Sequence, residues 1–376
     1  MILVLNSLNK GFLVNIMNNC ALCNTFISKE NQSEEHVIPQ AIGGRLKIKN
    51  FICRTCNNKF GHNWDSTLAN QLAFFSTSLN IKREKKLPNY LVNTLDGNQY
   101  LKQPQGDFIL TRPTEHIEKN PDGSLNIKIE APNFKIAKDI LKKVFKENNI
   151  SSESQNSISE KLKQNIAPMN QIIHDEINFG GEESGRSLVK TALAMTFLMG
   201  IDLKQCDLAT GYLLENREPC FGYFYSIDKD FVKNRNKDIP FHCVHIRAST
   251  ELKRIFGYIE YFGAFRVILS LASNYIGETK EKTYFIDPIN NQDFDLKIEL
   301  DVSDNEIEKI YNYEIYDLKV YENAIGGLLS KVVRKSKENN LINRIDEAIK
   351  KWDKNKTYDQ NISEALTYLK PFLNDF

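Results

Sequence analysis

The chain has 376 residues, of which 41% are hydrophobic and 26% are charged, the proportions of a globular protein with a buried core. This composition excludes a largely disordered chain, a collagen-like fibre and a membrane protein. The 49 Lys and Arg residues nearly balance the 48 Asp and Glu residues, so any contact with nucleic acid depends on a local basic patch.

The first 19 residues show no pattern of a secretory signal. They lack a basic leader, polar residues interrupt the apolar ones, and no small-residue cleavage site precedes Cys20. The longest later apolar run, at 188–199, is shorter than the ~20 residues of a membrane span. We therefore expect a cytoplasmic protein without membrane contact. We also expect residues 1–16 to be dispensable, with translation starting at Met17.

Four of the seven cysteines form two closely spaced pairs. Cys20 and Cys23 are the first pair, and Cys53 and Cys56, after 29 intervening residues, are the second. Two such Cys-x2-Cys turns can deliver four thiolates to the corners of one tetrahedral Zn²⁺ ion. We predict a structural zinc ion that stabilises a segment too small to fold alone, the alternative being four buried thiols without a metal.

The residues between and after the two pairs carry further motifs. The stretches CALC, EEHVIPQAIGG and CRTCNNKFGHNWD follow one another along the chain. In this order they resemble the zinc-knuckle subgroup of the HNH endonucleases, over roughly residues 20–70. The resemblance implies a ββα-metal fold and the hydrolysis of DNA phosphodiester bonds.

The resemblance also implies roles for three residues. His36 would be the general base that takes a proton from the attacking water, a task for which the pKa of imidazole is well placed. Glu35 would ligate a divalent cation, and Asn57 would be the second ligand. Mg²⁺ or Mn²⁺ is the expected cation, because hard cations prefer oxygen ligands.

Two further positions complete the comparison with the family pattern. Asn50 is the candidate for the middle asparagine, which holds the loop between the strands so that His36 points at the water. The last family ligand falls on Gly61, which has no side chain, so His62 or Asp65 would substitute for it. His62 is alternatively a solvent-exposed or DNA-facing residue that binds no metal.

The chain divides into four regions. We predict an N-terminal extension at 1–19, an HNH module with a structural zinc ion at 20–80, a linker at 81–107 and an α+β domain at 108–376. The role of the last domain would be target recognition or regulation. Within it, the turn residues at 120–123 predict a hairpin.

Short strand patterns separated by Gly-containing gaps predict an antiparallel meander in this domain. The expected strands are 220–227, 241–246, 255–262, 265–272, 282–286 and 294–300. The expected helices are 134–148, 186–199, 304–313, 318–335, 340–352 and 362–373. The predicted class is α+β: an N-terminal zinc-stapled ββα-metal module followed by a mixed antiparallel-sheet and helix domain.

Three conspicuous features of this domain are interpreted as structural. His242 and His245 are three residues apart in a predicted strand, where they point to opposite faces and cannot share an ion. The helix at 187–199 is apolar around most of its circumference, which is typical of a buried core helix. The glycine-rich run at 180–185 lacks the lysine and the spacing of a phosphate loop.

Basic residues gather near the predicted nuclease motifs. Between residues 20 and 90 there are ten Lys or Arg against five Asp or Glu, a local excess that would follow DNA phosphates. The sequence thus predicts a metal-dependent endonuclease acting on DNA, or on RNA, in restriction or antiphage defence. The alternative is a non-catalytic zinc module that binds nucleic acid or protein, with a ligand-sensing C-terminal domain. A small nucleotide activator or a homo-oligomer is compatible with both.

Overall fold

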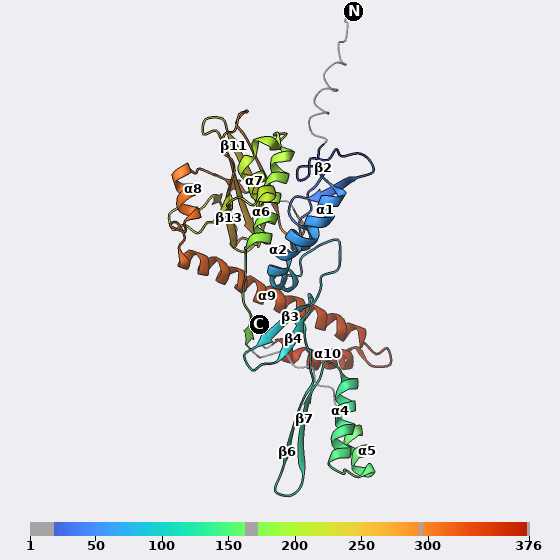
Figure 1. The fold of residues 1–376 in the computed structure, drawn as a ribbon. Coiled ribbons are helices and arrows are strands. Elements are labelled where there is room, and N and C mark those ends of the chain that lie inside the picture. Colours follow the sequence, from blue (N-terminus) through green and yellow to red (C-terminus); the bar gives the residue numbers. More distant parts are fainter. Residues whose placement is uncertain (1–18, 162–171, 293–295, 374–376) are drawn as a thin grey trace, which may run out of the picture. The chain divides into compact units, whose positions relative to one another are not determined.

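The structure is a computed structural model of the chain, in which residues 19–161, 172–292 and 296–373 are described (Figure 1). The described residues form two compact units. Unit 1 lies within residues 1–87 and 177–333, and unit 2 within residues 88–176 and 334–376. Both units combine helices with antiparallel strands, which confirms the α+β class. The predicted dispensable segment 1–16 and the start of the strand expected at 294–300 lie outside the described residues.

The N-terminal part of unit 1 folds as two strands followed by a helix. β1 (Gln32–His36) pairs antiparallel with β2 (Lys47–Cys53), and α1 (Arg54–Phe60) follows β2 without a loop. A π-helical turn, η2 (Gly61–Asp65), continues α1 into α2 (Ser66–Gln71). This is the ββα arrangement predicted from the sequence.

The larger part of unit 1 is an antiparallel sheet of five strands in the order β14-β11-β12-β13-β9. These strands are β9 (Phe221–Tyr223), β11 (His242–Ser249), β12 (Arg254–Tyr261), β13 (Phe265–Ala272) and β14 (Lys280–Ile286). β11, β12 and β13 are neighbours in both the chain and the sheet, so the predicted meander is confirmed for these three strands, whereas β14 pairs with β11 and β9 with β13 out of chain order. Side chains alternate between the two faces: Val244 and Ile246 enter one hydrophobic cluster, and Cys243 enters the other.

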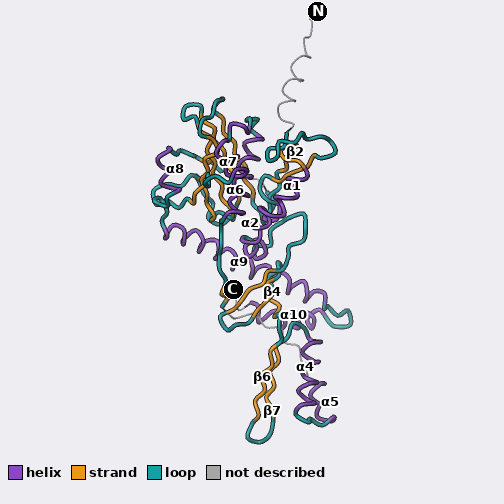
Figure 2. Tube along the Cα trace, in the orientation of Figure 1, coloured by secondary structure: helices purple, strands orange, loops and turns teal. Residues whose placement is uncertain are grey.

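Helices cover both faces of this sheet (Figure 2). α6 (Glu182–Leu198) and α7 (Asp207–Glu215) pack on one face, and α8 (Asp304–Tyr311) packs on the other. α6 also contacts β2, η2 and α2, so it lies between the ββα segment and the sheet. Every residue from Ser184 to Thr196 is buried, which confirms the predicted core helix.

Several short elements complete unit 1. They are η1 (Gln40–Ile42), α3 (Ala73–Ser78), η3 (Leu203–Gln205) and the paired strands β10 (Val232–Lys233) and β15 (Lys297–Ile298). α9 (Leu318–Lys350) begins in unit 1 and continues into unit 2.

Unit 2 contains a second sheet, a hairpin and helices. The sheet has the order β5-β4-β3-β8, with β3 (Tyr90–Thr94), β4 (Gln99–Lys102), β5 (Phe108–Leu110) and β8 (Ile173–His174). The predicted hairpin is present as β6 (Thr114–Lys119) and β7 (Leu125–Glu130). The helices are α4 (Phe134–Glu147), α5 (Ser152–Lys161), α10 (Tyr358–Leu373) and the later part of α9.

The two units differ from the division predicted from composition. The expected linker at 81–107 supplies β3 and β4, in which Val92 and Tyr100 are buried. The domain expected at 108–376 is shared between both units. The helices expected at 318–335 and 340–352 are the single helix α9, since no proline or glycine between them ends it.

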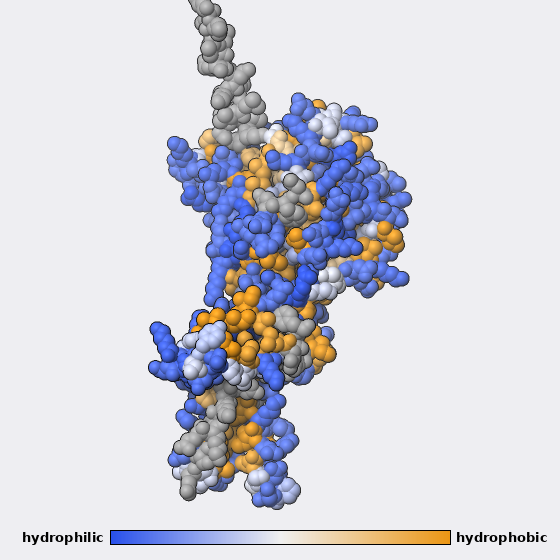
Figure 3. Space-filling model, turned by 180° about the vertical axis from the view of Figure 1, so that it is seen from behind, coloured by the Kyte–Doolittle hydropathy of each residue, from blue (hydrophilic) through white to orange (hydrophobic). Residues whose placement is uncertain are grey.

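The surface carries both hydrophobic and hydrophilic residues (Figure 3). None of the helices in the described ranges is long and apolar enough to cross a membrane. On the face drawn in Figure 3, hydrophobic residues are scattered among hydrophilic ones over unit 1 and gather more densely on unit 2. Ile342, Ile345 and Ile349 of α9 are among the exposed apolar side chains of unit 2. Their spacing places them on one face of the helix.

Candidate active site and metal-binding residues

The four paired cysteines meet at one end of the β1–β2 hairpin. Cys20 and Cys23 lie in a tight turn that ends at Asn24, whose backbone is left-handed (φ 56°), while Cys53 ends β2 and Cys56 lies in α1. The four sulfur atoms all lie within 4.8 Å of one another, and those of Cys23 and Cys53 are 3.7 Å apart. A tetrahedron with Zn–S bonds of ~2.3 Å has edges of about 3.8 Å, so the four cysteines fit a zinc ion.

The environment of these thiols is that of a closed, structural site. Cys23 is exposed and the other three cysteines are buried, so substrate has little access. Burial raises the pKa of Cys20 and of Cys56. Partial burial opposes ionisation of Cys23 as well, but hydrogen bonds with Thr25 lower its pKa to about 6. Across the part of the chain that the structure describes, no other group of three or more His, Cys, Asp or Glu side chains brings its ligand atoms so close.

The loop between β1 and β2 is packed tightly against itself and against the sheet. A Cβ atom on Gly44 would lie 1.9 Å from the carbonyl oxygen of Ile38, so only glycine fits there. Gly43 has a left-handed backbone (φ 100°), and a Cβ atom on it would lie 2.8 Å from Pro288. These constraints account for the Gly-Gly pair of the motif, and they fix the chain just after His36.

The two histidines of β11 have separate structural roles. The backbone N–H of Phe262 donates to Nδ1 of His242, so Nε2 carries the proton and donates to the Ile42 carbonyl at 2.8 Å. His245 lies on the other face, where its Nδ1 atom is 2.7 Å from Oγ1 of Thr283. Burial lowers the pKa of each histidine to about 4. The two histidines therefore have structural roles and do not share an ion, as predicted from the sequence. His242 anchors the β1–β2 loop.

His36 is the last residue of β1 and lies opposite Lys47 of β2. Its side chain is 19% exposed, and its buried Nε2 atom has no hydrogen-bond partner among the described residues. Glu84 Oε1 is 3.8 Å from this nitrogen but forms its own ion pair with Lys47 at 2.7 Å. Burial, helped by the charge of Lys47, lowers the pKa of His36. The imidazole is thus neutral near pH 7 and has a nitrogen available as a base.

Glu35 points into unit 1, where it meets a lysine of α6. Lys190 donates to Glu35 Oε1 and, at 2.5 Å, to Oδ2 of Asp65 in η2. Ser187, one turn earlier in α6, donates to the other Asp65 oxygen at 2.6 Å. Burial raises the pKa of Glu35. Burial opposes the charge of Lys190 too, but the two carboxylates outweigh it and raise the pKa of the ammonium, which stays charged.

Asn57 of α1 and Asp65 of η2 both lie next to Gly61. The Nδ2 atom of Asn57 donates to the Glu34 carbonyl at 3.0 Å, which turns Oδ1 the other way. A Cβ atom on Gly61 would lie 3.8 Å from Asn57 Oδ1 and 3.9 Å from Asp65 Oδ2, so both oxygens face the position of the last family ligand. Asn57 in α1 and Gly61 and Asp65 in η2 follow one another at four-residue steps, which places them on one side of the continuous helix. The structure therefore brings Asp65 to the predicted site.

Two predicted site residues lie away from this cluster. Asn50 is exposed at an irregularity of β2, and its left-handed backbone (φ 62°), which asparagine tolerates better than most residues, accounts for its presence. Within the described residues, the side chain of Asn50 makes no hydrogen bond to the loop that it was expected to hold. His62 is exposed in η2, whereas Asp65 at the end of the same turn meets Lys190.

Two residues of α6 that complete the cluster, Ser187 and Lys190, are not among the site residues predicted from the sequence. A signal for Lys190 is present, because a lysine inside an apolar, buried helix requires a carboxylate partner. The identity of the partner depends on the fold, since Lys190 and Glu35 are 155 positions apart in the chain.

A ββα unit with four clustered cysteines and an adjoining Glu–His pair has the features of a nuclease-type metal domain. Residues 20–73 match the family model described as HNH endonuclease. No curated protein and no solved structure matches the chain. The protein therefore has an N-terminal HNH domain with a four-cysteine cluster, and the matched residues end well before α6.

Proposed function

We propose that the protein is a metal-dependent endonuclease whose HNH domain hydrolyses phosphodiester bonds in DNA. One observation carries the proposal: a neutral imidazole nitrogen of His36, without a partner in the described residues, stands beside Glu35, which shares a cation with Asp65. A module that only binds nucleic acid needs neither the free base nor the paired carboxylates.

His36 supplies the base in this proposal. Its neutral imidazole accepts a proton from the water that attacks phosphorus. Because the loop after β1 is anchored through Ile42 to His242, the fold sets the position of the ring before substrate binds. Lys47 holds Glu84 in an ion pair, which limits the contact of that carboxylate with His36.

The oxygen atoms of Glu35, Asn57 and Asp65 would hold the divalent cation. They are hard donors of the kind that Mg²⁺ and Mn²⁺ prefer, and a cation of the chain, the Lys190 ammonium, already bridges the two carboxylates. When bound, the divalent cation would stabilise the negative charge that develops on the phosphate and on the leaving oxygen. Of the two alternatives for the last ligand, His62 and Asp65, this proposal selects Asp65.

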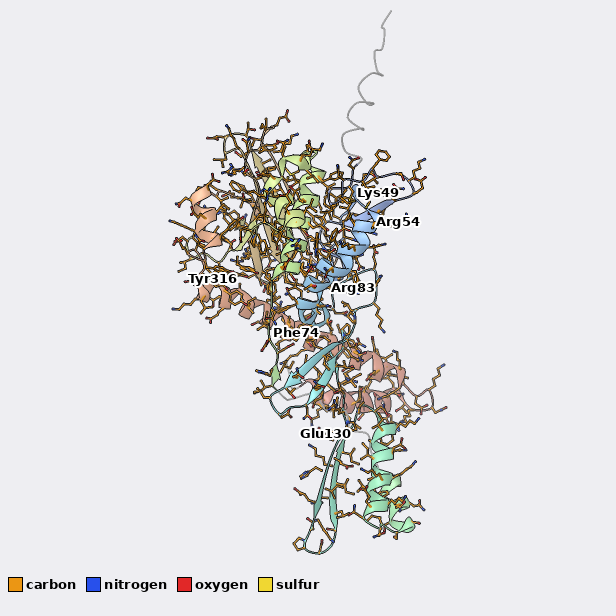
Figure 4. All side chains as sticks on the ribbon, in the orientation of Figure 1. Lys49, Arg54, Phe74, Arg83, Glu130 and Tyr316 are labelled. Carbon is orange, nitrogen blue, oxygen red and sulfur yellow. The ribbon has the colours of Figure 1, made fainter. Side chains whose placement is uncertain are left out.

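DNA would approach the exposed side of the HNH domain. Lys49 and Arg54 lie on the outer side of the hairpin and α1, away from the five-stranded sheet (Figure 4). Both are exposed, and basic side chains in this position contact phosphates. Arg83, labelled in the same view, is partly buried and donates to the Ala41 carbonyl, so it supports the β1–β2 loop instead.

The test is incubation of the zinc-loaded full chain with supercoiled plasmid DNA and with single-stranded RNA, with Mg²⁺, with Mn²⁺ or without either. His36→Ala should lose ~10²–10⁴-fold in cleavage rate, the usual contribution of a general base. Its zinc content and DNA affinity should stay unchanged. His116→Ala, which alters an exposed histidine of unit 2, is the matched control and should cleave like the wild type. Cleavage that persists in His36→Ala would refute the base assignment, and no cleavage by the wild type would favour the non-catalytic zinc module.

We extend the proposal to restriction or antiphage defence in the cytoplasm, with the residues outside 20–73 recognising the DNA or a nucleotide signal. The support is the two-part plan alone, a nuclease domain joined to a larger partner region. Phage plating on cells that carry the wild type or His36→Ala tests it. Equal plating efficiency on both would remove this role without affecting the proposed chemistry.

A further inference from the structure

The two carboxylates assigned to the divalent cation already share a cation of the protein. Lys190 donates from one ammonium group to Glu35 and, at 2.5 Å, to Asp65. The Lys190 side chain is only 2% exposed, so water does not compete for these contacts. Lys190 belongs to α6, which lies outside residues 20–73 that match the HNH family.

The ammonium lies where a divalent cation would need to be. A Mg²⁺ ligand oxygen lies about 2.1 Å from the ion, and both oxygens of Asp65 are already engaged, Oδ2 by Lys190 and Oδ1 by Ser187. Two cations on the same oxygens repel strongly in a buried site, where water screens little. The ammonium and the divalent cation are therefore alternative occupants rather than neighbours.

The position of the ammonium depends on α6 as a whole. α6 packs on β11, β12 and β13 as well as on η2, so it connects the sheet with the HNH domain. Just before the helix, Gly180 exchanges two hydrogen bonds with the Gln71 side chain of α2, at 2.8 and 3.0 Å. A shift of α6 relative to the HNH domain would withdraw the ammonium from both carboxylates together.

We propose that Lys190 is a resident cation of the nuclease site: it neutralises Glu35 and Asp65 until a divalent cation replaces it, so that α6 sets how readily the HNH domain loads metal. Calling these residues a nuclease site rests on the proposed function. The exchange of Lys190 for a divalent cation can be tested independently of that function, because it is measured as metal binding and not as cleavage.

The experiment measures Mn²⁺ binding to the zinc-loaded full chain by calorimetry and electron paramagnetic resonance, together with thermal unfolding. Lys190→Met removes the charge and keeps an unbranched side chain. It should bind one Mn²⁺ at least tenfold more tightly than the wild type, melt at a lower temperature without Mn²⁺, and recover most of that loss when Mn²⁺ is added. Lys102→Met is the matched control, since Lys102 is 1% exposed and donates to Ser336 within unit 2 at 2.6 Å. It should not gain affinity for Mn²⁺.

Lys190→Gln provides a second variant, because its amide can still donate to one carboxylate. It should also bind Mn²⁺ more tightly than the wild type. A folded Lys190 variant whose Mn²⁺ affinity is equal or weaker overturns the proposal and makes the lysine a permanent part of the site. If neither variant folds with or without Mn²⁺, a divalent cation cannot replace the ammonium, and the proposal is likewise rejected. If the variants bind Mn²⁺ more tightly but the wild-type chain cleaves no nucleic acid, the exchange of Lys190 for a divalent cation is supported. Only the proposed nuclease function is then contradicted.

Discussion

Two polar clusters involve residues of the HNH domain, and they are assembled in different ways. The four cysteines come from one 37-residue stretch, and two local turns bring their sulfur atoms together. The carboxylate cluster draws Glu35 from β1, Asp65 from η2 and Lys190 from α6. The first cluster therefore needs only the HNH domain, whereas the second exists only where that domain packs on the rest of unit 1. The residues that fit the zinc ion are thus close together in the sequence, whereas the residues of the proposed catalytic cation site depend on a distant helix.

The largest effect should follow from breaking the local cluster. Cys56→Ser removes a buried ligand, and because zinc binding and folding are one equilibrium in small zinc units, the HNH domain should lose its zinc and unfold. Zinc per chain and limited proteolysis within residues 20–80 measure this. Cys206→Ser, which alters a buried cysteine outside the cluster, should keep one zinc ion per chain. A Cys56→Ser chain that also keeps its zinc and its full activity would disprove the four-cysteine assignment.

The cysteine cluster can be predicted from the sequence, whereas the carboxylate cluster can be predicted only in part. Paired cysteine spacing identifies the thiol cluster because each pair forms a stereotyped turn. The choice between His62 and Asp65 depends on which side of η2 faces Ser187 and Lys190 of α6, a contact between segments that are distant in the chain. The partner of Lys190 depends on where α6 packs.

The fold, too, has parts that local sequence predicts and parts that depend on distant residues. Local periodicity predicts the hairpin, the meander strands and most of the helices. The division into two units instead depends on long-range pairing, in which the polar stretch 81–107 joins a sheet with residues 173–174.

A second prediction concerns the contact between the HNH domain and the sheet, in which His242 of β11 donates to the Ile42 carbonyl. Burial lowers the pKa of His242 to about 4, against about 6.5 in an unfolded chain. Below pH 6.5 the unfolded chain binds a proton that the folded chain does not bind, so stability falls as the pH drops from 6.5 towards 4. This histidine alone should remove about 3 kcal/mol from the free energy of unfolding at pH 4.

Urea unfolding at pH 7 and at pH 4 measures this loss. His242→Asn keeps an acceptor for the Phe262 N–H but no titrating group. The variant should be less stable than the wild type at pH 7 and should lose less stability between the two pH values. Equal losses of unfolding free energy in both proteins would show that a group other than His242 causes the loss of stability at low pH.

The smallest effect is expected on the exposed side of the HNH domain. Lys49→Ala should weaken DNA binding for all sequences and reduce the slope of log affinity against log salt by about 1, as expected for one lost phosphate contact. Lys128→Ala is a matched control, because both lysines are exposed on a strand and pair with a glutamate, at 3.0 Å for Lys49 and 2.7 Å for Lys128. It should leave DNA affinity unchanged. The same reduction in both variants would mean that the HNH surface has no special part in binding.

If Glu35, Asn57 and Asp65 form the cation site of a nuclease, cleavage must depend on Mn²⁺ concentration through these residues. Asp65→Asn should need at least tenfold more Mn²⁺ for half-maximal cleavage than the wild type, because a charged ligand is lost. His62→Ala, which alters an exposed residue of the same helical turn, should behave like the wild type. A raised Mn²⁺ requirement in His62→Ala, with none in Asp65→Asn, would contradict the account.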